Sequence, residues 1–187
     1  MKPERQAFLN TLREASISDD VPIVSETNGK FLHFLVGLTK AKDILEVGMA
    51  NGYSTIHLAD AVENNNGHVT TIDVSTPSIA WAKKNFKEAD VEHLITLHEG
   101  LAEDILPTLH GNLYDMIFID AMKKGYKTYW EHAKQMMKPD TLVVFDDVMK
   151  FKWKMEDFHT MMENETEYEW VILPIDDDDA TMIVRKK

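Results

Sequence analysis

Short runs of apolar residues alternate with stretches of helical periodicity along most of the chain. The apolar runs are rich in β-branched and aromatic side chains, a pattern that predicts strands. We expect strands at 44–47, 68–73, 94–98, 116–120, 142–145, 169–173 and 181–184. Helical periodicity predicts helices around 55–62, 79–88, 102–109, 126–137 and 155–164, and an amphipathic helix over residues 1–15.

The order of these elements predicts a layered α/β fold. The runs MIFID and LVVFDD are almost wholly apolar until their last residues, which is typical of central parallel strands covered on both faces. Only the segment 174–180 separates the last two strands, so they form a hairpin and one edge strand is expected to be antiparallel. We therefore predict a three-layer, Rossmann-like α/β domain with a seven-stranded, mostly parallel sheet and a C-terminal antiparallel hairpin strand. It would span residues 1–187, with a short N-terminal helical extension of about residues 1–20.

Composition narrows the class of protein. The 187 residues are 44% hydrophobic and suffice for one well-packed domain. The chain has no cysteine, which excludes disulfides and thiolate sites. It has no apolar run near the roughly 20 residues that span a bilayer and no signal-peptide core, so a soluble cytoplasmic protein without a membrane partner is expected. A net charge of −12 argues against nucleic acid and favours a small or cationic ligand. The acidic run 176–179 is either a solvated loop or a cation site.

The segment DILEVGMANGYS predicts a ligand-binding turn. The apolar run at 44–47 stops at Gly48, Gly52 follows, and a helical pattern then resumes. Strand, glycine turn and helix in that order receive nucleotide-like ligands in α/β sheets. Glu46 just before the turn would repel a pyrophosphate, but it suits the ammonium and sulfonium groups of S-adenosylmethionine.

Several predicted strands end in acids that converge on one edge of the sheet. Asp73 lies 25 residues after Gly48, close to the spacing at which a strand-end acid binds a ribose diol. Asp120, Asp146 and Asp147 offer hard oxygen ligands, which suit Mg²⁺ or Ca²⁺. The structural alternatives are that Asp73 caps a helix or turn and that Asp147 points away.

Lys123 follows the first of these metal-ligand candidates by three residues. With its pKa lowered by neighbouring cations, it could accept a proton from a substrate hydroxyl; otherwise it is a solvated surface lysine. Tyr126 and Tyr129 share one helical face, and on spacing alone they are expected to be packing residues.

These motifs together resemble one enzyme family. DILEVGMANGYST, TIDV, FIDAMKKGYKTYW and LVVFDDV resemble the cation-dependent class I O-methyltransferases, the caffeoyl-CoA and catechol O-methyltransferase group, from about residue 21 to 187. The resemblance implies the S-adenosylmethionine methyltransferase fold. It also implies transfer of a methyl group to a hydroxyl of a small catechol-like acceptor, with Mg²⁺ as the first choice of cation and Ca²⁺ or Mn²⁺ as alternatives.

The resemblance also implies roles for individual residues. It assigns catalysis to Lys123 and metal binding to Asp120, Asp146 and Asp147. The implied cofactor-binding residues are Val24, Glu46, Gly48, Gly52, Tyr53, Ser54, Asp73, Val74, Gly100, Ala102, Glu103 and Asp120.

This chain departs from the family pattern at several positions. Asp73 stands where the family usually has Glu, and Ala102 replaces a frequent polar residue. Asp147 replaces the usual Asn, which adds a negative charge to the metal site. Met122 replaces a common acid, and the family's I-G-D-G turn becomes an acidic run ending at Asp179. About 20 residues precede the resemblance, so reduced N-terminal helices and an open acceptor pocket are expected.

Two other functions stay open from the sequence. One is a tRNA hydroxyuridine O-methyltransferase, which a lysine-rich stretch between 123 and 138 would support and the net charge opposes. The other is an S-adenosylmethionine-binding protein with weak or no transfer activity. A homodimer is also compatible with the sequence.

Overall fold

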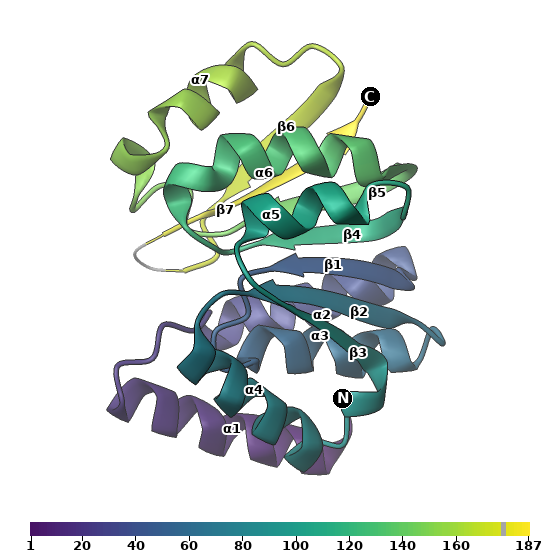
Figure 1. Ribbon diagram of the computed structural model, residues 1–187, viewed down its shortest axis with the longest axis vertical. Helices are drawn as coiled ribbons and strands as arrows, with labels where there is room; N and C mark the ends of the chain where they lie inside the picture. The colour runs from purple at the N-terminus through teal and green to yellow at the C-terminus, as the bar shows by residue number, and fades with distance from the viewer. Residues whose placement is uncertain (177–178) are drawn as a thin grey trace.

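A seven-stranded sheet forms the centre of the computed structural model, which describes residues 1–176 and 179–187 (Figure 1). The strands are β1 (Asp43–Val47), β2 (His68–Asp73), β3 (Ile95–Glu99), β4 (Tyr114–Ile119), β5 (Met137–Phe145), β6 (Tyr168–Leu173) and β7 (Thr181–Lys186). Their order across the sheet is β3-β2-β1-β4-β5-β7-β6. The predicted fold class is therefore confirmed.

The C-terminal hairpin differs in one respect from its prediction. β7 is antiparallel to both β5 and β6, so the reversed strand lies inside the sheet and β6 forms the edge. Side-chain burial follows this order: Met182 and Val184 of β7 are fully buried, whereas Trp170 and Val171 of β6 are exposed.

Helices cover both faces of the sheet (Figure 1). Their bounds are α1 (Pro3–Ser18), α2 (Glu26–Thr39), α3 (Tyr53–Glu63), α4 (Thr76–Glu88), α5 (Ala102–Ile105), α6 (Tyr126–Ala133) and α7 (Glu156–Glu163). One core cluster joins the sheet to residues of α1 to α4, and the other joins it to residues of α5 to α7. None of these helices, within the described residues, is long and apolar enough to cross a membrane.

Helix α2 was not predicted, because Gly29 and Gly37 interrupt its sequence and weaken its helical propensity. Ser25 caps its start by accepting a hydrogen bond from the backbone N–H of Asn28, at 3.0 Å. Burial of Leu32 and Val36 in the core then stabilises it. Tertiary packing thus decides this element.

Two of the predicted helices end earlier than expected. The segment 102–109 divides into α5 and a 3₁₀ turn over Leu106–Leu109. Pro107 lacks the N–H that a continuing α-helix would need. The segment 126–137 divides into α6 and a 3₁₀ turn over Lys134–Met136, and Met137 already belongs to β5.

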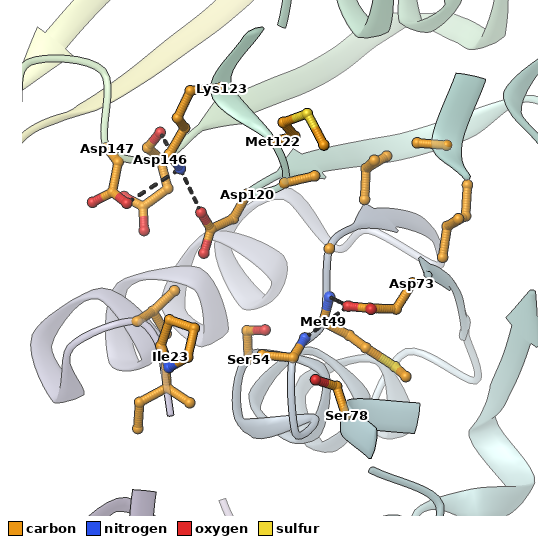
Figure 2. Close-up of a pocket in the computed structure, with 18 of the residues that line it drawn as sticks. Ile23, Met49, Ser54, Asp73, Ser78, Asp120, Met122, Lys123, Asp146 and Asp147 are labelled. Atoms are coloured by element: carbon orange, nitrogen blue, oxygen red, sulfur yellow. Dashed lines mark hydrogen bonds and ion pairs between the residues drawn. The ribbon is translucent and has the colours of Figure 1, made fainter. Parts of the chain in front are cut away.

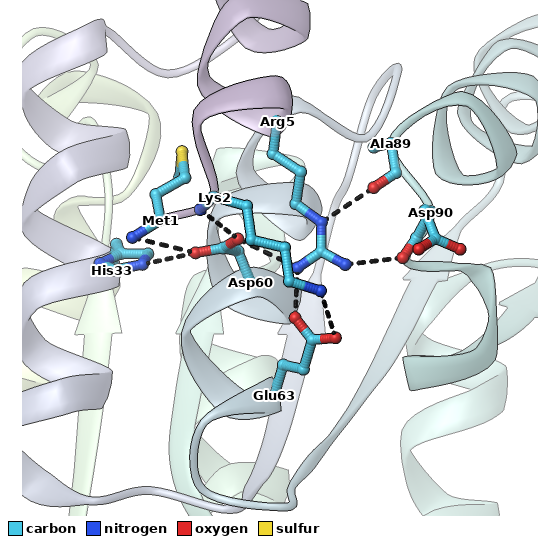
Figure 3. A network of polar contacts seen from close by, with 8 residues as sticks. All are labelled: Met1, Lys2, Arg5, His33, Asp60, Glu63, Ala89 and Asp90. Carbon is cyan, nitrogen blue, oxygen red and sulfur yellow. Dashed lines mark hydrogen bonds and ion pairs between the residues drawn. The ribbon is translucent and has the colours of Figure 1, made fainter.

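A buried ionic network fixes α1 to the rest of the fold (Figure 3). Arg5 is 3% exposed, and its guanidinium donates to the carboxylates of Asp60, at 3.0 Å, and Glu63, at 2.5 Å. It also donates to the backbone carbonyls of Ala89 and Asp90, at the end of α4. One side chain therefore ties α1 to both α3 and α4.

Asp60 depends on these partners for its charge. Burial alone would raise the pKa of Asp60, but hydrogen bonds from His33 and Arg5 outweigh it and lower this pKa far below its ordinary value of 3.8. A carboxyl with a lowered folded pKa stabilises the fold above its unfolded pKa. That contribution disappears as the pH falls.

Replacing Arg5 with Met should lower the free energy of unfolding by about 3 kcal/mol at pH 7, because Asp60 then keeps a buried charge after losing one of its charged partners. The loss should shrink as the pH falls below about 4, where Asp60 becomes protonated in the unfolded chain and in the variant. Urea unfolding at several pH values measures both effects. Arg13→Met on the same helix is the matched control; equal losses in the two variants would contradict the role of the network.

Candidate active site

A cavity of about 1060 Å³ opens at the carboxyl ends of the central strands. Residues from the ends of β1, β2, β4 and β5 line it, together with segments that follow β3 and precede α2. Figure 2 shows Met49, Ser54, Asp73 and Ser78 on one side, and Asp120, Lys123, Asp146 and Asp147 on another. The carboxyl edge of a parallel sheet is where α/β folds bind ligands.

The glycine turn after β1 is held by sterics and by Asp73. Gly48 has φ +90°, and a side chain there would collide with the backbone carbonyl of Asp120. Gly52 has φ +88°, and a side chain there would collide with the Phe86 ring. The Asp73 carboxylate accepts hydrogen bonds from the backbone N–H groups of Met49 and Ala50, both at 3.0 Å. Asp73 therefore fixes the turn while also lining the cavity.

Glu46 takes a different position from the one its sequence neighbourhood suggested. It is fully buried and lies outside the cavity lining. Its carboxylate accepts hydrogen bonds from the hydroxyls of Ser54, at 2.7 Å, Thr55, at 2.5 Å, and Thr71, at 2.7 Å. Glu46 thus anchors the start of α3 to the sheet and holds Ser54 at the cavity. Direct contact between Glu46 and a ligand stays a prediction.

Three carboxylates and one lysine meet at the ends of β4 and β5. Lys123 is 10% exposed, and its ammonium lies 2.7 Å from the Asp120 carboxylate and 3.2 Å from that of Asp147. Asp146 is buried beside them. Asp147 adopts φ +55°, a left-handed conformation that Asp and Asn tolerate better than most residues. This backbone turn brings its carboxylate to Lys123, so the alternative in which Asp147 points away is wrong.

The pKa values in this cluster follow from burial and mutual charge. Burial, with the charges of Asp120 and Asp147, raises the pKa of Asp146. Burial would lower the pKa of Lys123, but Asp120 and Asp147 outweigh it and raise this pKa. The lowered pKa expected for Lys123 beside bound cations stays a prediction, because its neighbours within the chain itself are carboxylates.

Tyr126 forms hydrogen bonds to the acidic cluster, a role that its helical spacing did not predict. The ring is fully buried, and its hydroxyl donates to the backbone carbonyl of Asp146, at 2.8 Å. The same hydroxyl accepts a hydrogen bond from Lys123 Nζ, at 2.8 Å. It also lies 3.2 Å from the carbonyl oxygen of Ile119. Tyr126 therefore fixes the lysine relative to both strand ends.

The part of the cavity that follows β2 and β3 has apolar side chains and one hydrogen-bonded pair, Tyr129 and Glu103. Val74 and Ala102 line it, and Tyr129 donates a hydrogen bond to the Glu103 carboxylate at 3.1 Å. Tyr129 was expected to be a packing residue, and although it is 2% exposed, it also lines the cavity.

The structure brings most of the predicted site residues into one space. Those lining the cavity are Val24, Gly48, Tyr53, Ser54, Asp73, Val74, Gly100, Ala102, Glu103, Asp120, Lys123, Asp146 and Asp147. Glu46 and Gly52 lie behind this lining and shape the turn.

The rim contains two residues that the sequence did not single out, Lys150 and Phe151, which line the cavity after β5. Asp176 and Asp179 of the acidic run also line it. Asp179 accepts hydrogen bonds from the backbone N–H groups of Met149 and Lys150, at 2.9 and 3.1 Å. The acidic run therefore partly serves to hold the rim, and its central residues, 177 and 178, lie outside the described part of the chain.

Comparison with known proteins shows the family of this chain. The sequence profile described as O-methyltransferase matches residues 2–178. The chain belongs to the O-methyltransferase family. The enzyme class predicted from its motifs is thereby confirmed.

Named relatives and a solved structure agree with the family. The chain is 38% identical to a catechol O-methyltransferase of Niastella koreensis over 164 residues, which cover 86% of this chain and 70% of the relative. It is 28% identical to a caffeoyl-CoA O-methyltransferase of Medicago sativa over 155 residues, covering 79% of this chain and 62% of the relative. An O-methyltransferase of Streptomyces achromogenes involved in tomaymycin synthesis, solved with S-adenosylmethionine, superposes with TM-score 0.86 and 30% identity, covering 96% and 89% of the two chains.

The acidic cluster of this O-methyltransferase has the donor chemistry of a hard divalent cation site. Carboxylate oxygens are the ligands that Mg²⁺ and Ca²⁺ prefer. Within the described residues, however, no three acidic or histidine side chains already stand at metal-binding spacing. Lys123 instead pairs with two of the carboxylates. The residue types fit a divalent cation. Binding of that cation would require Lys123 to give up its ion pair with Asp120 or Asp147.

Glu46 should make the free energy of unfolding of this O-methyltransferase depend on pH. Burial outweighs the three hydroxyl donors and raises the pKa of Glu46 from its ordinary value of 4.5 to about 7. An acid with a raised folded pKa contributes stability below its unfolded pKa, and this contribution is lost as the pH rises through the folded pKa. From pH 4.5 to above 7, the wild type should lose up to about 3 kcal/mol relative to Glu46→Gln. Urea unfolding of both proteins across this range tests it, and a difference that stays flat would contradict the buried, protonated carboxyl.

Proposed function

We propose that this chain transfers the methyl group of S-adenosylmethionine to a hydroxyl of a small, catechol-like acceptor, with the help of a divalent cation. Mg²⁺ is the first choice, with Ca²⁺ and Mn²⁺ as alternatives. The observation that carries the proposal is that one cavity contains both the glycine turn and the cluster of Asp120, Lys123, Asp146 and Asp147. A cofactor and an acceptor bound at these two places would share a single space.

The cofactor half rests on the turn and the polar groups around it. Ser54 offers a hydroxyl at the start of α3, and Asp73 offers a carboxylate at the end of β2. Val74, Ala102 and Glu103 provide a partly apolar pocket that suits an adenine ring. Bound S-adenosylmethionine supplies a methyl group that its sulfonium already activates. The chain's own contribution would then be alignment of the two reactants.

The acceptor half rests on the acidic cluster. When bound, a divalent cation supplies positive charge that favours the ionised form of an acceptor hydroxyl. Asp120, Asp146 and Asp147 are the residues that would hold it. Lys123 Nζ lies beside them and would hold or accept the acceptor's proton. Because these carboxylates raise the lysine pKa, neutralising them would bring it back towards the range of a general base.

The walls of the cavity near the cluster favour a flat, partly apolar acceptor. Met122, which is 61% exposed, and Phe151 both line the cavity on this side. An aromatic ring could lie against them while two neighbouring oxygens face the carboxylates. The relatives named catechol and caffeoyl-CoA O-methyltransferases are consistent with this class of acceptor. The net charge of −12 weighs against a tRNA acceptor.

A paired binding and turnover experiment tests the proposal. Calorimetry with S-adenosylhomocysteine should show binding, and a catechol panel should be methylated with Mg²⁺ but not with excess chelator. Asp146→Asn should lower turnover by at least about 100-fold, because it removes a charged ligand, and should change S-adenosylhomocysteine affinity by less than about threefold. Asp140→Asn, an exposed site on β5 outside the cavity, is the matched control.

The outcomes separate the alternatives. Cofactor binding without transfer to any member of the panel would favour a binding protein over a methyltransferase for catechols. Full turnover in chelator would remove the cation from the proposal. Salt-sensitive binding of tRNA would favour the nucleic-acid alternative.

A further inference from the structure

The carboxylate of Asp146 is held from behind by two side chains. Asn28 Nδ2, from α2, donates to Asp146 Oδ1 at 2.7 Å, and Thr181 Oγ1, from β7, donates to the same oxygen at 2.9 Å. Asp146 also lines the cavity. Both of these hydrogen bonds are accepted by Oδ1. Among the described residues, no hydrogen bond to Oδ2 is found, so this oxygen is available to a ligand.

The backbone at Asn28 is fixed by its surroundings. Its N–H caps α2 by donating to Ser25 Oγ at 3.0 Å. The next residue, Gly29, packs against the ring of His57 so closely that a Cβ would lie 2.7 Å from His57 Nε2. The start of α2 therefore cannot shift easily, and the amide of Asn28 reaches Asp146 from a rigid position.

The side-chain amide of Asn28 is only partly hydrogen-bonded. Its side chain is fully buried, and Oδ1 has no hydrogen-bond partner among the described residues. Burying a polar group with one end unpaired costs free energy, and an apolar side chain of similar size would avoid this cost. An unsatisfied buried amide that contacts a site residue is a candidate for a role in the site.

We propose that Asn28 is a positioning residue for Asp146. Asp120 and Asp147 repel the Asp146 carboxylate electrostatically and would favour its rotation away from them. The two donors on Oδ1 oppose this rotation and keep Oδ2 facing the cavity, ready to bind the divalent cation. The inference rests on the cation role in the proposed function. Hydrogen-bonded partners of this kind orient metal ligands and raise metal affinity.

The test measures cation binding apart from catalysis. Calorimetry with Mg²⁺, and electron paramagnetic resonance with Mn²⁺, are run on the protein saturated with S-adenosylhomocysteine. Asn28→Ala should weaken cation affinity about tenfold and leave S-adenosylhomocysteine affinity within about twofold. Asn28→Leu fills the same volume without a donor and should behave alike, so a folding defect in the alanine variant does not decide the result. Thr181→Val, which removes the other donor, should also weaken cation binding.

Turnover provides a second readout that a purely structural role would not give. In Asn28→Leu, the Mg²⁺ concentration for half-maximal activity should rise about tenfold, while turnover at saturating Mg²⁺ changes less than about threefold. Asn65→Ala is the control, since the Asn65 amide donates to the backbone carbonyl of Ala41, at 2.9 Å, away from the cavity. It should leave cation affinity unchanged.

Two results would overturn the inference, and they differ in what else they affect. Equal cation affinity in wild type and Asn28→Leu overturns the inference alone, because the wild-type cation site is then intact. Failure of the wild type to bind any divalent cation overturns both this inference and the cation role in the proposed function.

Discussion

Repulsion between carboxylates at the carboxyl edge of the sheet is the constraint around which the site is organised. Parallel strands end at the same edge, so acids that follow β4 and β5 are forced together. Asp120, Asp146 and Asp147 would repel one another and become protonated if nothing opposed them. Lys123 pairs with two of them, and Tyr126 fixes the lysine. The cluster therefore contains one internal cation, and the Asp146 carboxylate, bound by Asn28 and Thr181, lines the cavity beside it.

Carboxylates also lie beside the glycine turn, but there they are bound by hydrogen-bond donors of the protein. Asp73 and Glu46 are also acids at the ends of strands or near them, but hydrogen bonds to the protein engage their oxygens. Asp73 binds backbone N–H groups of the glycine turn, and Glu46 binds three hydroxyls. Acids around the turn thus hold its geometry, whereas Asp120 and Asp147 both pair with Lys123 and line the cavity. The glycine turn and the acidic cluster therefore face one space.

The sequence predicted the sheet well, because runs such as MIFID are apolar on both faces and leave few alternatives. It failed at α2, whose glycines disguise a helix that tertiary packing stabilises. It also placed the reversed strand at the edge, since the short hairpin loop shows that the two strands are antiparallel but not which of them pairs with β5. In the site, Gly48, Asp120 and Lys123 were found from local motifs. Asn28 could not be found that way, because its partner Asp146 is 118 positions away. The raised pKa of Lys123 depends on contacts that spacing alone does not reveal.

If the proposed function is right, cofactor and cation occupy one cavity at the strand ends. A crystal of the protein grown with S-adenosylhomocysteine and Mn²⁺, measured at a wavelength where manganese scatters anomalously, tests this arrangement. We expect the cofactor along the glycine turn, with Ser54 and Asp73 in contact. We also expect an anomalous peak bounded by Asp120, Asp146 and Asp147, with Lys123 displaced from at least one of them. Cofactor density at the turn without a manganese peak among these carboxylates would contradict it.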